Sequence, residues 1–510
     1  MDISWTVLLA IIIGLILIKY IFFAKDPHFK KYGIPYIEPH SILYDVGQVL
    51  LKKISIVNQT MKTYNHDTSA KYIGFYEFTK PIIMIRDLDI LKNITVKNFE
   101  HFVDHRSFTD PEAEPLFSNN LFSLKGDQWR EIRNLLTPAF TSSKMRAMFK
   151  LMSECANNFT DFLVEESRKG STEFNSKDIF TRYTNDTIAT CAFGISVDSM
   201  KNPKNEFYVL GRRVTNFEGI QMLKFVFAMT FPKLTKLLGI KLFDKAADSF
   251  FLNLVRDTIA ARDEKGIYRP DMIQLMMETR NHEPGSKKPE LTIENMTSQA
   301  FIFFFAGFDT TSTLMCFAAH EVAANSDVQT ELQAEIDEVL EKCNGEPTYE
   351  AITGMQYLEA VIYEALRLYP VVVAVDRVCT KNFELPPAVP GAKPYTLETG
   401  SAVLLPMWAI HRNPEHYPEP EKFDPNRFLG EGKKNINTSA YFPFGVGPRM
   451  CIGNRFALLE TKVLLFQLLA KCNIKPAKKM ILPMRINSSS VAVTAEGGFW
   501  LEIHPRKIDK

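Results

Sequence analysis

The chain has 510 residues, of which 46% are hydrophobic and 23% charged, so its composition is that of a globular protein and excludes wholesale disorder. Its 60 Lys and Arg against 59 Asp and Glu leave a formal net charge of +1, without the basic excess of a protein that binds nucleic acid through its overall charge. The seven cysteines show no CxxC spacing, which argues against a secreted disulfide scaffold or a zinc module and suits a reducing compartment.

The first predicted element is a membrane-spanning helix at the N-terminus. Ile3 to Phe23 is an apolar run, interrupted only by Lys19, and its length is close to the roughly 20 residues that cross a bilayer core. Asp2 precedes the run and three lysines follow it, so we expect the body to stay in the cytosol. A cleaved signal peptide is the alternative, but no positive segment precedes the run and no convincing cleavage site follows it. The predicted organisation is a transmembrane signal-anchor over 1–24, a proline-containing linker over 25–40 and one domain over 41–510.

From Trp129 to about Lys342 the chain is predicted to be mainly helical. Apolar periodicity predicts helices from Trp129 to Pro138 and over approximately 144–166, 176–193, 205–217, 247–263 and 271–280. Thr297 to about Asn325 predicts a long helix that is apolar all round and therefore belongs in the middle of a large fold. His282 to Pro289 is a predicted surface linker.

The β portion is predicted to be small. Short strands are expected near 70–86, 374–388, 397–405 and 489–503, whereas four prolines rule out a helix over 412–428 and predict a coil. The predicted fold class is mainly α with a smaller β portion.

The glycine-rich stretch from Phe444 to Gly453 contains the most informative cysteine. Cys451 lies just before a predicted helix, Asn454 to Lys471, whose free N–H groups and positive dipole end favour a thiolate. The glycines let the backbone pass close to something flat, and Arg449 is a permanent cation suited to a carboxylate. Together these residues predict a cradle for a flat, anionic cofactor with one axial sulfur ligand.

The order F-x-x-G-x-R-x-C-x-G resembles the haem-binding signature of the cytochrome P-450 family, and it is matched by Phe444, Gly447, Arg449, Cys451 and Gly453. The resemblance implies the P-450 fold behind the N-terminal transmembrane helix, haem b as the cofactor and Cys451 as the thiolate ligand of its iron.

Further matches follow in the order expected of the family. Glu364 and Arg367 resemble its E-x-x-R element, and Arg427 lies in a stretch similar to its P-x-R-F element; the resemblance implies that all three support the haem cradle structurally. Trp129 and Arg133 resemble the family's W-x-x-x-R element. The resemblance implies that this pair, together with Arg377, binds the haem propionates.

The stretch from Ala306 to Thr311 resembles the family's oxygen-activation motif. Ala306 and Thr310 are four residues apart and share a helix face, and a mid-helix Thr can bond a preceding carbonyl. The resemblance implies a proton relay in which Thr310 holds dioxygen and water while Asp309 connects them to solvent. By the same analogy, an apolar, aromatic-walled substrate pocket is expected at Phe117, Phe122, Phe301, Phe305, Ala306 and Val373.

The motifs look most like those of insect microsomal members associated with detoxification. The implied activity is insertion of one oxygen atom from O2 into a lipophilic small molecule, a xenobiotic or an endogenous lipophile, at the endoplasmic reticulum membrane. No flavin or dinucleotide motif is evident, so electrons from NADPH are expected to arrive through a membrane-bound flavoprotein reductase, with cytochrome b5 as a second candidate donor. Lys144, Arg146 and Arg455 are candidates for steering an acidic partner.

Three other functions stay open. A haem-thiolate isomerase or dehydratase acting on a preformed peroxide needs neither a reductase nor the Asp309–Thr310 pair. A lipophile-sequestering protein would bind its ligand without consuming NADPH. A membrane cysteine hydrolase would use Cys451 as its nucleophile, although no motif places a histidine beside it.

Overall fold

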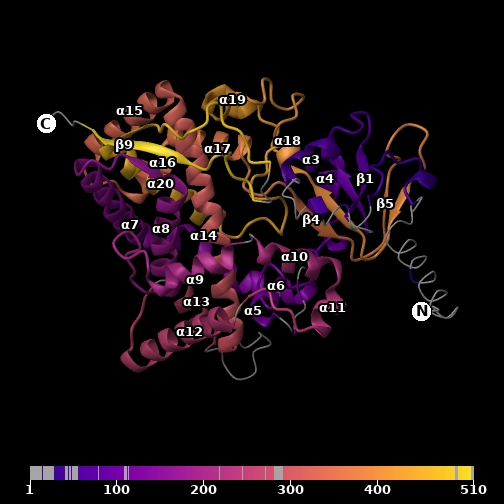
Figure 1. Cartoon of the computed structure of the whole chain (residues 1–510), viewed down its shortest axis with the longest axis horizontal. Coiled ribbons are helices and arrows are strands. Elements are labelled where there is room, and N and C mark those ends of the chain that lie inside the picture. The colour runs from indigo at the N-terminus through magenta and orange to yellow at the C-terminus, as the bar shows by residue number, and fades with distance from the viewer. Residues whose placement is uncertain are drawn as a thin grey trace, which may run out of the picture.

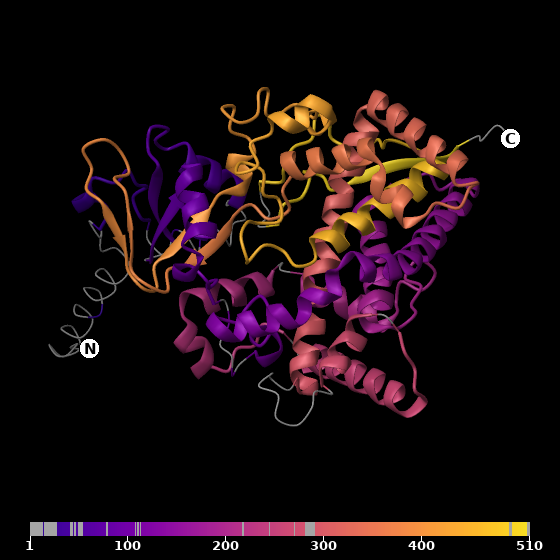
Figure 2. The same ribbon diagram turned by 180° about the vertical axis from the view of Figure 1, so that it is seen from behind.

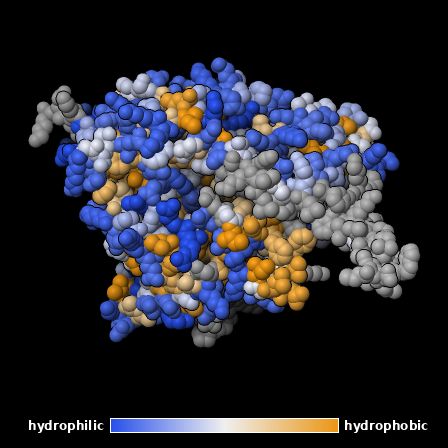
Figure 3. Space-filling view, viewed as in Figure 1, coloured by the Kyte–Doolittle hydropathy of each residue, from blue (hydrophilic) through white to orange (hydrophobic). Residues whose placement is uncertain are grey.

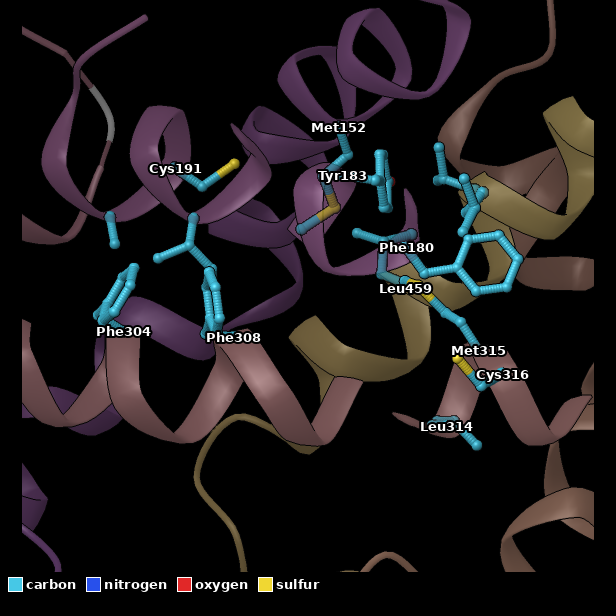
Figure 4. Close-up of a cluster of buried hydrophobic side chains, with 14 of the residues drawn as sticks. Met152, Phe180, Tyr183, Cys191, Phe304, Phe308, Leu314, Met315, Cys316 and Leu459 are labelled. Carbon is cyan, nitrogen blue, oxygen red and sulfur yellow. The ribbon is translucent and has the colours of Figure 1, made fainter. Parts of the chain in front are cut away.

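The helix α14 (Ile293–Ala324) runs through the middle of the structure, with other helices packed along its length (Figure 1). It begins after Thr292, whose hydroxyl accepts the N–H of Asn295, and about two thirds of its residues are buried. In Figure 4, Phe304 and Phe308 of α14 point towards Cys191, while Phe180 and Tyr183 lie farther along the same cluster. The long apolar helix predicted from Thr297 to Asn325 is thus confirmed as the central helix.

The computed structural model describes residues 28–40, 44, 47–48, 55–77, 80–107, 109, 112, 114–216, 219–243, 245–269, 271–280, 291–488 and 492–506, together with Gly14. Apart from Gly14, the predicted transmembrane helix lies outside these residues, and so does the predicted surface linker from His282 to Pro289. Within them, α14 is the one helix long and apolar enough to cross a bilayer, and most of its apolar window is buried inside the fold.

The predicted helices between residues 129 and 280 are all present, with small shifts of their ends. They are α6 (Gly126–Leu136), α7 (Ser142–Arg168), α8 (Ser176–Ile188), α9 (Glu206–Thr215), α12 (Lys245–Lys265) and α13 (Met272–Arg280). The helix after the cysteine is α20 (Asn454–Lys471), as predicted. The other described α-helices are α3 (Ile56–Tyr64), α4 (Leu88–Lys92), α5 (Pro115–Ser118), α10 (Ile220–Thr230), α11 (Pro232–Leu237), α15 (Ser326–Lys342), α16 (Tyr349–Gly354), α17 (Gln356–Leu368), α18 (Met407–Ile410) and α19 (Gly430–Asn435).

Three small sheets make up the β portion. The largest has the order β1 (Tyr72–Glu77), β2 (Lys80–Ile85), β7 (Ala402–Leu405) and β4 (Val375–Val378), with β2 parallel to β7 and the other pairs antiparallel. The second has the order β3 (Glu173–Asn175), β9 (Trp500–Pro505) and β8 (Cys472–Pro476), and the third pairs β5 (Phe383–Leu385) with β6 (Tyr395–Leu397). The fold is therefore mainly helical with a smaller sheet portion.

Two strand and coil predictions need correction. Of the strand predicted near 489–503, only the end becomes β9, because Gly497 and Gly498 take positive φ angles and turn the chain just before it. The proline-rich stretch 412–428 is coil until Pro425, where a short 3-10 turn runs to Phe428. Proline is accepted there because it occupies the first turn, where its missing N–H has no partner to lose.

The loop that carries the cysteine joins two hydrophobic cores. Phe442 and Val446 pack into the core around the four-stranded sheet, whereas Phe444 and Ile452 pack against the larger helical core. In both ribbon views this loop lies beside the middle of α14 (Figures 1 and 2). The fold thus places the loop where the sheet region and the helical region meet.

Candidate active site

The cysteine loop is closed by its own backbone hydrogen bonds. The N–H of Cys451 donates to the carbonyl of Phe444 at 2.8 Å, and the N–H of Met450 donates to that of Gly447 at 3.0 Å. Gly447 has φ +75°, and a Cβ built on it would lie 2.0 Å from the carbonyl oxygen of Thr95. This glycine is therefore required by a left-handed turn and by the close approach of another backbone segment. A Cβ on Gly453 would meet ordinary contacts at 3.9 Å or more, so space does not demand glycine there.

The side chain of Cys451 has accessible surface although protein surrounds it. It is the one exposed cysteine among the described cysteines, yet surrounding protein raises the pKa of its thiol by desolvation. The backbone N–H of Gly453 and the charge of Arg133 act in the opposite direction and favour the thiolate. An accessible sulfur enclosed by protein is the environment that a ligand of a bound group requires.

The middle of α14 borders the same region. Ala306 is exposed although Phe304 and Phe308 on either side of it are fully buried. The Phe140 ring lies between the cysteine loop and α14. It is 3.9 Å from the position that a Cβ would take on Gly453, and its centroid is 5.4 Å from that of the Phe303 ring on α14. We infer that Ala306 and Cys451 border one space, the inner space.

The predicted bond of Thr310 is present: its hydroxyl donates to the carbonyl of Ala306 at 2.5 Å. The carboxylate of Asp309 is half-exposed and lies 2.8 Å from Nζ of Lys177 on α8. That ammonium also donates to the backbone carbonyl of Asp309 at 3.0 Å and to the hydroxyls of Ser312 and Thr313 at 2.9 and 2.6 Å. Sequence reasoning missed Lys177, because nothing local relates two residues that are 132 positions apart.

Three arginines gather near the cysteine with few acidic partners. Arg133 is half-buried and forms no side-chain hydrogen bond or ion pair with any described residue, and Arg377 is buried with its Nε unpartnered. Burial lowers the pKa of Arg377 to about 10 and that of Arg449 to about 9, and the like charges of Arg377 and Arg133 contribute to the lowering at Arg449. Guanidinium N–H groups without a partner near Cys451 favour the binding of a carboxylate there.

The guanidinium of Arg449 makes its hydrogen bonds within the protein. Its Nε donates to the carbonyl of Val103 and its Nη2 to that of Leu124, both at 2.7 Å, and the guanidinium stacks over the Trp129 ring with 4.1 Å to the centroid. Trp129 and Arg449 were predicted separately as cofactor-binding residues, and their contact ties the cysteine loop to α6 and to the segment before α6. Towards a bound anion, Arg449 contributes its charge.

Two of the predicted supporting residues, Arg367 and Arg427, lie beside the carboxylate of the third, Glu364. Nε and Nη2 of Arg367 lie 2.7 and 2.8 Å from the two carboxylate oxygens of Glu364, and neither side chain has any exposed surface. Nε of Arg427 lies 3.4 Å from the same carboxylate. The remaining donors of Arg367 go to the carbonyls of His411, Pro420 and Lys422. The cluster thus ties α17 to the coil that leads to the cysteine loop.

The predicted substrate-contacting residues differ in how accessible they are and fall into three groups. Ala306 is exposed, Phe305 is half-buried, and Phe122 is 38% exposed and stacks on His105. Phe117 and Val373 are buried with small accessible remnants. Phe301 is 0% exposed and packs among Phe243, Phe251 and Phe305, so it belongs to the core and offers no surface to a ligand.

The residues fit haem. Among the described residues, no three or more His, Cys, Asp or Glu side chains are arranged to hold a bare metal ion. A metal bound by Cys451 would therefore need a cofactor that supplies its remaining ligands. Haem does so. Its two carboxylates suit the donors of Arg133 and the unpartnered Nε of Arg377, whose Nη1 and Nη2 donate to the carbonyls of Asp376 and Val446. The accessible thiol and the small residue at 306 leave room for a flat ring.

Comparison with known proteins points the same way. A family model described as cytochrome P-450 matches residues 39–501. The chain is 45% identical to cytochrome P-450 9e2 of Blattella germanica, over 99% of this chain and 97% of that protein. It is 40% identical to probable cytochrome P-450 9f2 of Drosophila melanogaster (95% and 96% covered) and 35% identical to probable cytochrome P-450 6a21 of the same organism (98% and 98% covered).

Proposed function

The chain belongs to the cytochrome P-450 family of monooxygenases, and we propose that it is a membrane-anchored member that inserts one oxygen atom from O2 into lipophilic small molecules. Xenobiotics such as insecticides or plant toxins, or endogenous lipophiles, are the proposed substrates, with electrons supplied from NADPH by a flavoprotein reductase. The observation that carries the proposal is the accessible thiol of Cys451, on a loop that the Phe140 ring links to α14 near Ala306.

The chain's own residues would hold the cofactor from two sides. Cys451 would ligate the iron, and Arg133 and Arg377 would bind the propionates, with Trp129 and Arg449 fixing the cradle between them. Phe444, Gly447 and Gly453 shape the loop. When bound, haem supplies the iron that activates dioxygen, and electron donation from the thiolate favours cleavage of the O–O bond.

We assign proton delivery to Asp309 and Thr310. The Asp309 carboxylate reaches solvent on one side and is held by Lys177 on the other. The Thr310 hydroxyl lies one helical turn after Ala306 and donates its proton to the Ala306 carbonyl, so its oxygen can accept a hydrogen bond from a water molecule that carries the proton to the inner space. Lys177 acts as a positioning residue for Asp309.

Asp309→Asn is expected to lower the rate of product formation about 100-fold, since a positioned proton donor typically contributes about 10²–10⁴-fold to a rate. Lys177→Met should cause a smaller loss, because the carboxylate remains but is no longer held. The measurement is the rate of product formation in the haem-loaded enzyme with its reductase, together with the NADPH consumed. Product formation at the wild-type rate in Asp309→Asn would remove Asp309 from the relay.

The reductase is proposed to dock near the cysteine side of the molecule. Arg146 and Arg455 are exposed and Lys144 is half-buried at the start of α7. Reversing Lys144 and Arg455 to Glu is expected to raise the KM for reductase about tenfold at low ionic strength and far less at high salt, because exposed charges act mainly by steering. Lys201→Glu, at an exposed position after α8, serves as the control. An unchanged KM at low salt would contradict this docking face.

An apolar patch supports contact with the membrane. Ile220, Leu237 and Leu238 on and beside α10 and α11 are 65%, 80% and 59% exposed. Figure 3 shows orange, hydrophobic surface in the region of α10 and α11, below its centre. Apolar surface of this kind is typical of membrane or protein contact sites. We propose an anchor over 1–24 and a linker over 25–40, with a catalytic domain over 41–510 on the cytosolic side of the endoplasmic reticulum.

Reconstitution tests the proposed function against its rivals. In vesicles with a flavoprotein reductase, the chain should consume NADPH and place labelled oxygen from O2 in the product. Turnover of a peroxide without NADPH would indicate an isomerase or dehydratase, and binding without NADPH consumption would indicate a sequestering protein. Among the described residues no histidine hydrogen-bonds to Cys451, which disfavours a cysteine hydrolase.

A further inference from the structure

Glu114 is a buried carboxylate that holds two distant segments together. It directly precedes α5 and is 3% exposed. One of its oxygens accepts the backbone N–H of Leu242 at 2.5 Å and that of Phe243 at 3.4 Å, on the connection between α11 and α12. Burial raises the pKa of this carboxyl, while the two amide hydrogen bonds lower it. A buried acid that is held by backbone amides from another segment fixes the distance between the two segments.

The two joined segments carry an aromatic wall. Phe117 of α5 and Phe243 have ring centroids 5.4 Å apart, and both contact Phe305 of α14, at 5.5 and 6.2 Å. Phe305 immediately precedes Ala306, which borders the inner space. The positions of the Phe117 and Phe243 rings thus depend on the link that Glu114 makes.

The rest of the α5 segment is held by other groups. The side chain of Gln299 on α14 accepts the N–H of Leu121 at 2.8 Å and donates to the carbonyl of Asn119 at 2.9 Å. Arg449 donates to the carbonyl of Leu124 at 2.7 Å. Removing the Glu114 carboxylate should therefore loosen the wall while leaving the cysteine loop and the end of the segment in place.

We propose that Glu114 is a positioning residue that sets the shape of the substrate wall and so determines which apolar ligands the enzyme accepts. The proposal rests on the proposed function, because the inner space is a substrate site only if the chain binds haem at Cys451. Glu114 acts through Phe117 and Phe243 and touches no reacting atom.

Two probes of different size test the proposal in the haem-loaded protein. Imidazole reports access to the iron, whereas 4-phenylimidazole adds a ring that must fit the wall; both are titrated by the shift of the Soret band. Glu114→Ala is expected to raise the Kd of 4-phenylimidazole about tenfold, because Phe117 and Phe243 are no longer held in place to contact its added ring, and that of imidazole less than about twofold. Glu114→Gln keeps one acceptor oxygen and should give a smaller change, and it replaces the alanine variant if that variant does not fold.

Amide hydrogen exchange separates this proposal from the proposed function. Glu114→Ala should speed exchange at Leu242 and Phe243 about tenfold, which can be measured with or without haem. The control is Lys236→Ala, which removes an exposed ion pair with Glu112 between the same two regions and should change neither measurement. Unchanged exchange, or faster exchange with an unchanged ratio of the two Kd values, would overturn the positioning role. A wild-type protein that binds no haem would instead overturn the proposed function, while the exchange rates would still show whether Glu114 links the segments.

Discussion

Cys451→Ala is expected to abolish the strongly red-shifted Soret band that the wild-type protein should show after reduction with dithionite and exposure to carbon monoxide. That shift requires a thiolate ligand of the haem iron, and Cys451 is the one exposed cysteine among the described cysteines. The positive charge of Arg133 and the N–H of Gly453 favour the thiolate at this position. Monooxygenase activity should be lost with the band.

A matched control uses another thiol. Cys316→Ser changes a fully buried cysteine on α14, whose thiol pKa is raised to about 12 by burial, and it should leave the red-shifted band in place. If Cys451→Ala kept the band, the assignment of the ligand would be wrong. A wild-type haem spectrum without the shift would argue against thiolate ligation, and well-folded protein that takes up no haem would refute the cofactor.

Arg367→Ala is expected to destabilise the protein by about 3–5 kcal/mol and to lower its haem content, because it leaves the buried carboxylate of Glu364 without its main partner. Neither side chain has exposed surface, and burial raises the pKa of Glu364 although Arg367 and Arg427 both lower it. The free energy of unfolding in urea and the haem bound per chain measure the effect.

Two variants show whether the charge or the packing matters. Arg427→Ala should cost less than Arg367→Ala, because its Nε lies 3.4 Å from the carboxylate and its side chain is partly exposed. The double variant Glu364→Gln with Arg367→Met should recover part of the lost stability, since it removes both charges at similar volume. A cost below about 1 kcal/mol for Arg367→Ala would contradict the supporting role.

Features encoded by neighbouring residues were predicted well. The helices around α14 follow from local apolar periodicity, and the bond from Thr310 to the Ala306 carbonyl follows from the spacing of four residues within a helix. The contact between Glu364 and Arg367 is also local, because residues three apart share a helix face. The short strands were harder: β2 and β7 pair although more than 300 residues separate them, so their register is invisible in either segment alone.

The sequence by itself determined the cysteine loop, the central helix and the family to which they point, because each depends on residue types at short, fixed spacings. Only the tertiary structure decided that Lys177 holds Asp309, that Glu114 holds Leu242 and Phe243, and that Gly447 must be glycine because of the Thr95 carbonyl. It also decided that Phe301 is core rather than pocket. These contacts join residues that lie far apart in the chain, and packing around α14 brings them together without leaving a local pattern in the sequence.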